Sequence, residues 1–131
     1  MKKPSAGVKR VLLVEDEPVI CQVCLRVLTS EGFDVDIAAN GDVAQEMLGK
    51  KDYDLCLIDF RTPVMNGEQL YQVIIGKHPK LAEGTIFTTG DVADGYTQRF
   101  LEMAGRPYLP KPFTPDELKT IVQETLRQIE K

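Results

Sequence analysis

The 131-residue sequence lacks both a long apolar run and an excess of positive charge. No segment approaches the roughly 20 apolar residues of a membrane-spanning helix, and none of signal-peptide type precedes the first predicted strand. The net charge of −4 argues against nucleic acid as the main partner, because neutralising phosphates requires a basic surface. With 43% hydrophobic and 27% charged residues, the sequence predicts a globular, cytoplasmic protein that does not contact membranes.

Cysteines are few, and their odd number argues against a disulfide framework. Cys21 and Cys24 spell C-x-x-C, but a redox pair usually lies at a helix N-terminus, where the dipole lowers the thiol pKa. Pro18 is expected in the first helical turn, so both cysteines fall further into that helix, among apolar residues. We interpret them, and Cys56 in an apolar strand, as structural side chains.

Two further absences concern phosphoryl chemistry. No G-x-G-x-x-G or G-x-x-x-x-G-K-[ST] loop occurs, which argues against a nucleotide-binding protein. The only histidine, His78, precedes Pro79 at a predicted helix end, so autonomous histidine-kinase activity has no candidate residue.

Strand and helix patterns alternate along the whole chain. Strands are predicted at 8–14, 33–38, 53–59, 85–89 and 107–109, and helices at 18–31, 41–48, 68–77, 91–104 and 114–129. Segment 33–38 alternates apolar and acidic residues, which predicts a strand with one exposed, acidic face. Five strand–helix units predict parallel strands with helices on both faces, in one domain over 1–131 with its core at about 8–129.

Carboxylates follow two of the apolar strands. Glu15, Asp16 and Glu17 come after the first strand, and Asp59 ends the third. The carboxyl ends of parallel strands meet at one edge, where open α/β sheets place their sites. Two unit charges about 4 Å apart repel by about 4 kcal/mol at an effective dielectric near 20, so such a cluster requires a cation. Oxygen ligands suit Mg²⁺.

Polar residues follow the last two strands as well. Thr88 and Thr89 end the fourth strand, and Lys111 follows the fifth. A carboxylate beside a metal can attack phosphorus to form an aspartyl phosphate, while a hydroxyl and an ammonium contact the phosphoryl oxygens. Each residue alone has an ordinary explanation as a helix cap or turn, but their agreement at four strand ends favours a phosphoryl site.

From about residue 8 to 129, the sequence resembles the receiver domains of two-component response regulators. The matching segments are LLVEDEP at 12–18, IDFRTPVMNG at 58–67, TG at 89–90 and YLPKPF at 108–113. The resemblance implies an α/β fold with a single doubly wound, five-stranded parallel sheet, flavodoxin-like order 2-1-3-4-5, and five helices.

The resemblance also implies a function that is not enzymatic in the usual sense. Asp59 would accept a phosphoryl group in a phosphorelay, from a phosphohistidine of a histidine kinase or phosphotransfer protein. Mg²⁺ would be held by Asp16, Asp59 and the main-chain carbonyl of Arg61, with Glu15 acting through water. The family more often has two aspartates where this chain has Glu15 and Asp16.

Lys111 and Thr89 would bind the phosphoryl oxygens. Thr88 is an alternative to Thr89, although Gly90 directly after Thr89 matches the small residue of the family's pattern. In such domains the threonine moves and an aromatic residue turns inward, which changes the face formed by the fourth helix, fifth strand and fifth helix. Tyr108 is the matching aromatic, with an ordinary half-buried strand tyrosine as the alternative. That face would contact an unknown target or a second copy of the chain.

Arg61 and Asp91 stand two residues after Asp59 and Thr89, respectively. Either they pair across the mouth of the site and set the phosphoryl lifetime, or both are solvated, and the sequence leaves both possibilities open.

Two other classes of protein share part of this pattern. A haloacid-dehalogenase-like phosphatase needs a second aspartate where Arg61 stands, and a longer fold with a cap. The more serious alternative is a phosphorylation-independent interaction module on the same fold. We expect either a stand-alone receiver or part of a larger regulator or hybrid sensor kinase, and segments 89–91 and 106–113 resemble receivers of hybrid kinases.

Overall fold

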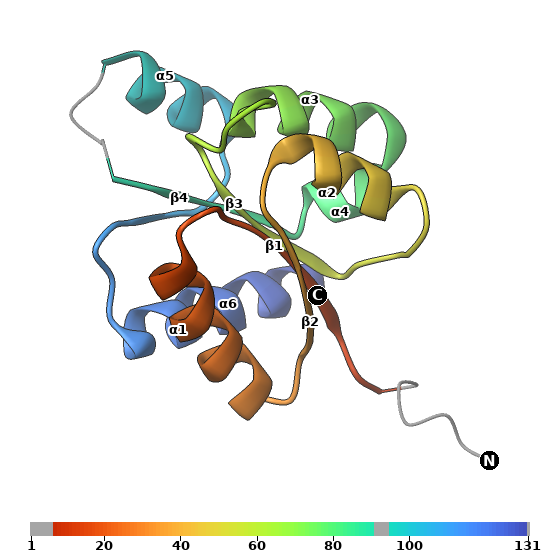
Figure 1. Ribbon diagram of the computed structural model, residues 1–131, viewed down its shortest axis with the longest axis vertical. Helices are drawn as coiled ribbons and strands as arrows, with labels where there is room; N and C mark the ends of the chain where they lie inside the picture. Colours follow the sequence, from red (N-terminus) through yellow and green to blue (C-terminus); the bar gives the residue numbers. More distant parts are fainter. Residues whose placement is uncertain (1–6, 91–94, 131) are drawn as a thin grey trace.

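A computed structural model describes residues 7–90 and 95–130, which form a five-stranded parallel sheet with helices on both faces (Figure 1). The strands are β1 (Arg10–Val14), β2 (Asp34–Ala38), β3 (Leu55–Asp59), β4 (Thr85–Thr89) and β5 (Tyr108–Pro110). The helices are α1 (Pro18–Ser30), α2 (Gly41–Leu48), α3 (Gly67–Lys77), α4 (Pro79–Ala82), α5 (Gly95–Ala104) and α6 (Pro115–Ile129). The strand order β2-β1-β3-β4-β5, parallel throughout, confirms the predicted fold class.

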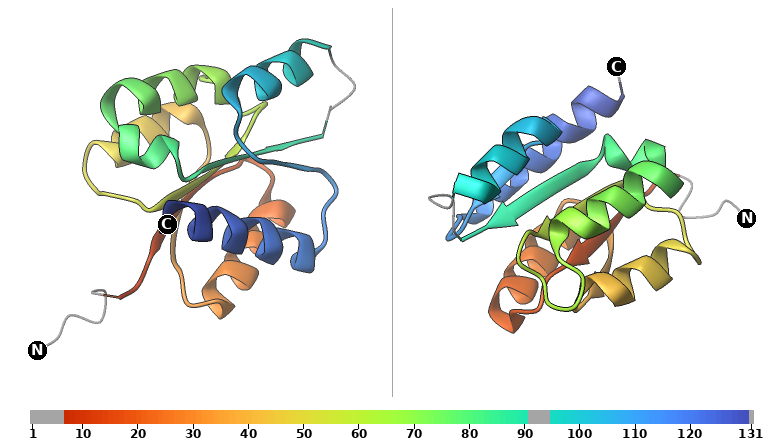
Figure 2. Two further views of the ribbon diagram at one scale, coloured as in Figure 1. Left: turned by 180° about the vertical axis from the view of Figure 1, so that it is seen from behind. Right: turned by 90° about the horizontal axis from the view of Figure 1, so that it is seen from above.

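Alternate side chains of the central strands fill two separate cores. In β1, Leu12 and Val14 belong to the core under α2, α3, α4 and α5, whereas Val11 and Leu13 belong to the core over α1 and α6. The views in Figures 1 and 2 show the same division, with α1 and α6 together on one side of the sheet. Every residue of β3 and β4 is buried, as parallel central strands require. Polar chemistry is therefore confined to the ends of these strands.

The loop between β3 and α3 has a closely fixed backbone. The Gly67 N–H donates to the Phe60 carbonyl at 2.9 Å, and a Cβ on Gly67 would lie 2.8 Å from the Phe60 Cα, so only glycine fits. Asn66 and Gln69 form a reciprocal capping box that begins α3 at this point. Val64 has φ of 70°, an unfavourable conformation for a β-branched residue. The loop that follows Asp59 is thus held in one shape by several independent contacts.

Two helices differ from the predicted pattern. The third helix ends at Lys77, before Pro79, as predicted, but Pro79 also begins the additional short helix α4, because proline is well accommodated at a first helical position. Leu81 of α4 is buried in the core. The described part of the predicted helix at 91–104 begins at Gly95, and Asp91 lies outside the described residues. Within 7–90 and 95–130, no helix is both long and apolar enough to cross a membrane.

The edge strand β2 departs from the predicted alternation in its second half. Ile37 is 38% exposed, whereas Asp36 is partly buried. Asp36 accepts hydrogen bonds from the Lys51 Nζ at 2.8 Å and the Tyr53 hydroxyl at 2.6 Å, which compensate its carboxylate for lost water. These bonds, the one from Lys51 foremost, lower the pKa of Asp36. The predicted alternation is confirmed for Phe33, Asp34 and Val35, because Asp34 is exposed and the other two pack against the core, but it is wrong for Asp36 and Ile37.

Candidate functional site

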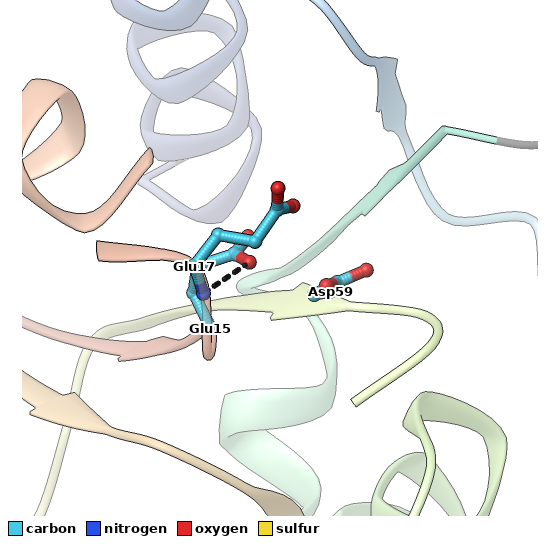
Figure 3. A group of neighbouring side chains, drawn as sticks. All are labelled: Glu15, Glu17 and Asp59. Atoms are coloured by element: carbon cyan, nitrogen blue, oxygen red, sulfur yellow. Dashed lines mark hydrogen bonds between the residues drawn. The ribbon is translucent and has the colours of Figure 1, made fainter. Parts of the chain in front are cut away.

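Three carboxylates converge at the carboxyl edge of the sheet. Glu15 directly follows β1, Glu17 precedes the first residue of α1, and Asp59 ends β3. Oxygen atoms of these three side chains, which we call the acidic cluster, all lie within 4.8 Å of one another. Figure 3 shows the three side chains, with the dashed line marking the hydrogen bond from the Glu17 N–H to the Glu15 carboxylate at 3.2 Å. The predicted convergence of acids from two strand ends is confirmed.

The Lys111 ammonium lies among these three carboxylates. Its Nζ is 3.0 Å from Glu15 Oε1, 2.9 Å from Glu17 Oε1 and 3.2 Å from Asp59 Oδ2. An ammonium has three protons, so each of them has one carboxylate acceptor. One positive charge among three negative charges nevertheless leaves the site with an excess of negative charge.

The backbone fixes Lys111 at this edge. The Lys111 N–H donates to the Thr89 carbonyl at 2.8 Å, directly after the pairing of Thr89 with Pro110 in the β4–β5 ladder. The peptide bond from Lys111 to Pro112 is cis. Lys111 therefore leaves the sheet beside the end of β4, and its side chain crosses to the ends of β3 and β1.

Burial and charge shift the pKa values of two groups here. Burial raises the pKa of Glu15, which is only 2% exposed, and the nearby charge of Asp59 raises it further against the opposing effect of Lys111. Burial alone would lower the pKa of Lys111, but the bonds to Glu17 and Glu15 and the charge of Asp59 raise it above its ordinary value. Lys111 is therefore a permanent cation, and Glu15 carries its charge at a cost that further positive charge would relieve.

The two candidate threonines both lie at the end of β4 and are buried, Thr88 being 3% and Thr89 0% exposed. Thr88 is paired in register with Asp59, and its carbonyl accepts the Phe60 N–H at 2.8 Å. Thr89 is bonded through its carbonyl to Lys111. The sheet thus brings Thr88 next to Asp59 and Thr89 next to Lys111.

The acid that sequence reasoning missed is Glu17. It belongs to the acidic cluster, whereas Asp16, the expected metal ligand, is exposed at the same turn and lies outside that group of three. The run of three acids was the available signal. Strand periodicity could not identify which acid turns back toward β3, because the chain leaves the strand at Glu15 and its direction then depends on the start of α1.

The remaining predicted residues lie at the rim. Arg61 is exposed, and its N–H donates to Asp59 Oδ1 at 3.1 Å. Asp91 is outside the described residues, so its pairing with Arg61 stays a prediction. Tyr108 is 39% exposed on β5 and lies beside Gln98 and Leu101 of α5.

The two cysteines of the C-x-x-C motif are free thiols on α1. Cys21 is partly buried, and its thiol donates to the Glu15 carbonyl at 3.4 Å. Burial raises the pKa of both thiols, that of Cys24 to about 12, so the reactive thiolate forms are disfavoured. This supports their interpretation as structural residues.

The donor chemistry of the acidic cluster fits a hard divalent cation. Glu15, Glu17 and Asp59 offer only carboxylate oxygens, which Mg²⁺ prefers over nitrogen and sulfur. A divalent charge also matches the excess of negative charge around Lys111. These three side chains, with Asp16 at the same turn, are the residues that could hold Mg²⁺.

Known proteins are similar to this chain in sequence and in fold. Residues 11–123 match the family model of the response regulator receiver domain. The chain is 33% identical over 109 residues to the transcriptional regulatory protein CutR of Streptomyces coelicolor, a match that covers 83% of this chain and 49% of CutR. The chain therefore spans about half the length of this relative.

Two solved structures are similar along nearly their whole length. A CheY-like response regulator receiver protein from Methanospirillum hungatei has a TM-score of 0.85 and 29% identity, over 94% of this chain and 97% of that one. The receiver domain of the sensor histidine kinase PA1611 from Pseudomonas aeruginosa has a TM-score of 0.80 and 32% identity, over 95% and 99%. That domain has a magnesium ion coordinated in its active site cleft. The chain belongs to the response regulator receiver domain family, whose members are signalling modules of two-component systems and not enzymes in the usual sense.

Proposed function

We propose that Asp59 accepts a phosphoryl group from the phosphohistidine of a histidine kinase or phosphotransfer protein. The observation that carries this proposal is the position of the Lys111 ammonium, 3.2 Å from Asp59 Oδ2 in a site with excess negative charge. Asp59 is 6% exposed, at the sheet edge where α/β proteins bind ligands. The surrounding residues thus combine a nucleophile with a fixed cation.

The two oxygens of Asp59 have different surroundings, which suits an attack through one of them. Oδ1 accepts the Arg61 N–H, whereas Oδ2 faces Lys111. In the proposed transfer, an Asp59 oxygen forms a bond to phosphorus as the phosphorus–nitrogen bond of the phosphohistidine breaks, and the imidazole takes the electron pair. Lys111 and Thr89, or Thr88 in its place, hold the phosphoryl oxygens.

Mg²⁺ is the cofactor of this proposal. It would be held by Asp16, Asp59 and the Arg61 carbonyl, with Glu15 acting through water. Bound there, it would neutralise the charge of the transferring phosphoryl group. The acidic cluster supports a cation at this edge, and the PA1611 relative provides the parallel.

The output of the proposed receiver is a change in the face formed by α5, β5 and α6, through Thr89 and Tyr108. Residues 8–129 would act as one domain, which a downstream protein or a second copy of the chain would contact. Tyr108 on β5 is 39% exposed and lies beside Gln98 and Leu101 of α5, which supports its part in such a change.

The test is the mass of the protein after incubation with acetyl phosphate and Mg²⁺. We expect one added phosphoryl group, absent in Asp59→Asn and retained in Asp52→Asn, which changes an exposed acid before β3 as a matched control. Equal labelling of the Asp59→Asn protein contradicts the assignment. An unlabelled wild type that still binds its partner supports the phosphorylation-independent interaction module instead.

A further inference from the structure

The three carboxylates that hold Lys111 differ in how firmly they are placed. The side chains of Glu15 and Asp59 are 1% and 8% exposed, whereas that of Glu17 is 59% exposed. Glu17 nevertheless makes the shortest contact with the ammonium, at 2.9 Å. Lys111 is therefore bound to two buried acids and to one acid that water can solvate.

All three Lys111 ammonium protons have carboxylate acceptors, and one of these acceptors is Asp59 itself. On phosphorylation the proton on Asp59 passes to a phosphoryl oxygen, so any second bond from Lys111 to the phosphoryl group must be taken from Glu15 or Glu17. Breaking the bond between Lys111 and Glu15 would leave a buried, uncompensated carboxylate, which is strongly unfavourable. Breaking the bond between Lys111 and Glu17 leaves a carboxylate that water solvates, and a solvent-exposed ion pair contributes little to stability. The arriving phosphoryl group also repels Glu17, since both are negative. The contact between Lys111 and Glu17 is thus the one that yields.

Release of this contact does not disturb the backbone of Glu17. Its N–H donates to the Glu15 carboxylate at 3.2 Å, and its carbonyl accepts the Cys21 N–H at 3.0 Å, within the first turn of α1. The Glu17 side chain makes no capping bond to that helix. The carboxylate can therefore turn outward while the rest of the residue stays in place.

We propose that Glu17 is a positioning residue that holds Lys111 before phosphorylation and competes with the phosphoryl group for its ammonium. This proposal rests on the proposed function and adds a regulatory element to the same site. Removing the competitor makes Lys111 available sooner, so phosphorylation becomes faster and a phosphoryl analogue binds more tightly.

The first test compares Glu17→Gln, which loses the charge, with Glu17→Asp, which keeps the charge but is one methylene too short to reach Lys111. We expect both to raise the rate of phosphorylation by acetyl phosphate at saturating Mg²⁺, and the affinity for beryllofluoride, by about two- to fivefold. A Glu17→Asp protein that behaves as wild type, beside a faster Glu17→Gln protein, overturns the proposal in favour of a general charge effect. Weaker Mg²⁺ binding in both variants overturns it in favour of a metal-ligand role.

The second test is a double-mutant cycle with Lys111→Met, read as beryllofluoride affinity. The gain from Glu17→Gln should disappear when Lys111 is absent, and a gain that persists overturns the proposal. If Lys111→Met does not fold, the comparison of Glu17→Gln with Glu17→Asp decides alone. A wild type that neither gains phosphoryl mass nor binds beryllofluoride defeats the proposed function itself, and this inference with it. A wild type that is labelled on Asp59 at the same rate as both Glu17 variants defeats only this inference.

Discussion

Two groups of charged side chains in this protein contrast in their balance. The Asp36 network, which comprises Asp36, Lys51 and Tyr53, gives one carboxylate two hydrogen-bond donors and lowers its pKa. The site at the carboxyl edge gives one ammonium three carboxylates. The first group satisfies its charge within the fold, whereas the second does not.

The difference separates a structural role from a binding role. Charged groups that serve only the fold gain by being neutralised, because buried charge costs free energy. An excess of one sign is retained where a ligand of the opposite sign completes the site. Burial raises the pKa of Glu15, and the charge of Asp59 raises it further, as an excess of negative charge requires.

The largest difference between the two groups is expected when the lysine of each group is removed. Lys111→Met should lower the free energy of unfolding by about 3 kcal/mol in EDTA, because three clustered carboxylates lose the ammonium that contacts each of them. The matched Lys51→Met variant removes a lysine that is 44% exposed and should cost less than about 1 kcal/mol. Urea unfolding at neutral pH and low salt measures both. Equal losses would mean that solvent screens the site as fully as the surface.

Removing an acid from each group should have opposite effects on stability. Asp59→Asn relieves repulsion with Glu15 and should raise the metal-free unfolding free energy by about 1 kcal/mol. Asp36→Asn loses charge-assisted bonds from Lys51 and Tyr53 and should lower it by about 1 kcal/mol. Both changes are read from urea midpoints with an unchanged denaturant slope. Changes of the same sign would remove the basis for contrasting the two groups.

The pH dependence of stability sharpens the same contrast with a smaller effect. A raised folded pKa means that Glu15 costs stability as pH rises above its ordinary value of 4.5. A lowered folded pKa means that Asp36 contributes stability above its ordinary value of 3.8, and that this contribution is lost as pH falls below it. When the unfolding free energy is measured across pH, Glu15→Gln should flatten its decline toward neutral pH. Asp36→Asn should flatten its decline in acid. Profiles parallel to that of the wild type would contradict both assignments.

The smallest stability effect is expected at the exposed rim. Arg61→Ala should leave the unfolding free energy within about 0.5 kcal/mol of the wild type.

If Arg61 and Asp91 shield the phosphoryl group from water, Arg61→Ala and Asp91→Ala should each speed its loss by similar factors. The double variant should then add little, since both changes open one path. Phosphoryl decay followed in time tests this, and additive effects or unchanged lifetimes would identify both residues as solvated.

The fold was largely predictable because its signals are local. Apolar runs bounded by acids, glycine and proline identify the strands, and parallel order follows from the alternation with helices. The misplaced details depended on tertiary contacts. Pro79 both ends one helix and begins another, and Asp36 is held inward by two partners that lie 15 and 17 residues away in sequence.

The site was predictable to the level of strand ends but not of individual contacts. Asp59 and Lys111 follow from their position after an apolar strand, and their contact across 52 residues of sequence confirms that they meet. The role of Glu17 depends on how the chain turns between β1 and α1, which no residue pattern encodes. Which threonine contacts a phosphoryl group depends on hydroxyl direction, and a strand in which every residue is buried carries no alternation to reveal it.

Phe60 connects Asp59, the proposed phosphoacceptor, to helix α5. Its ring, one peptide bond after Asp59, lies 6.1 Å from that of Phe87 on β4 and 5.3 Å from that of Phe100 on α5. Tyr71 of α3 completes the group, with its ring 5.4 Å from Phe87 and 6.2 Å from Phe100. Interiors this closely packed do not absorb a displacement by compressing. A shift of the Asp59 backbone is therefore transmitted to α5 through the contact between the Phe60 and Phe100 rings.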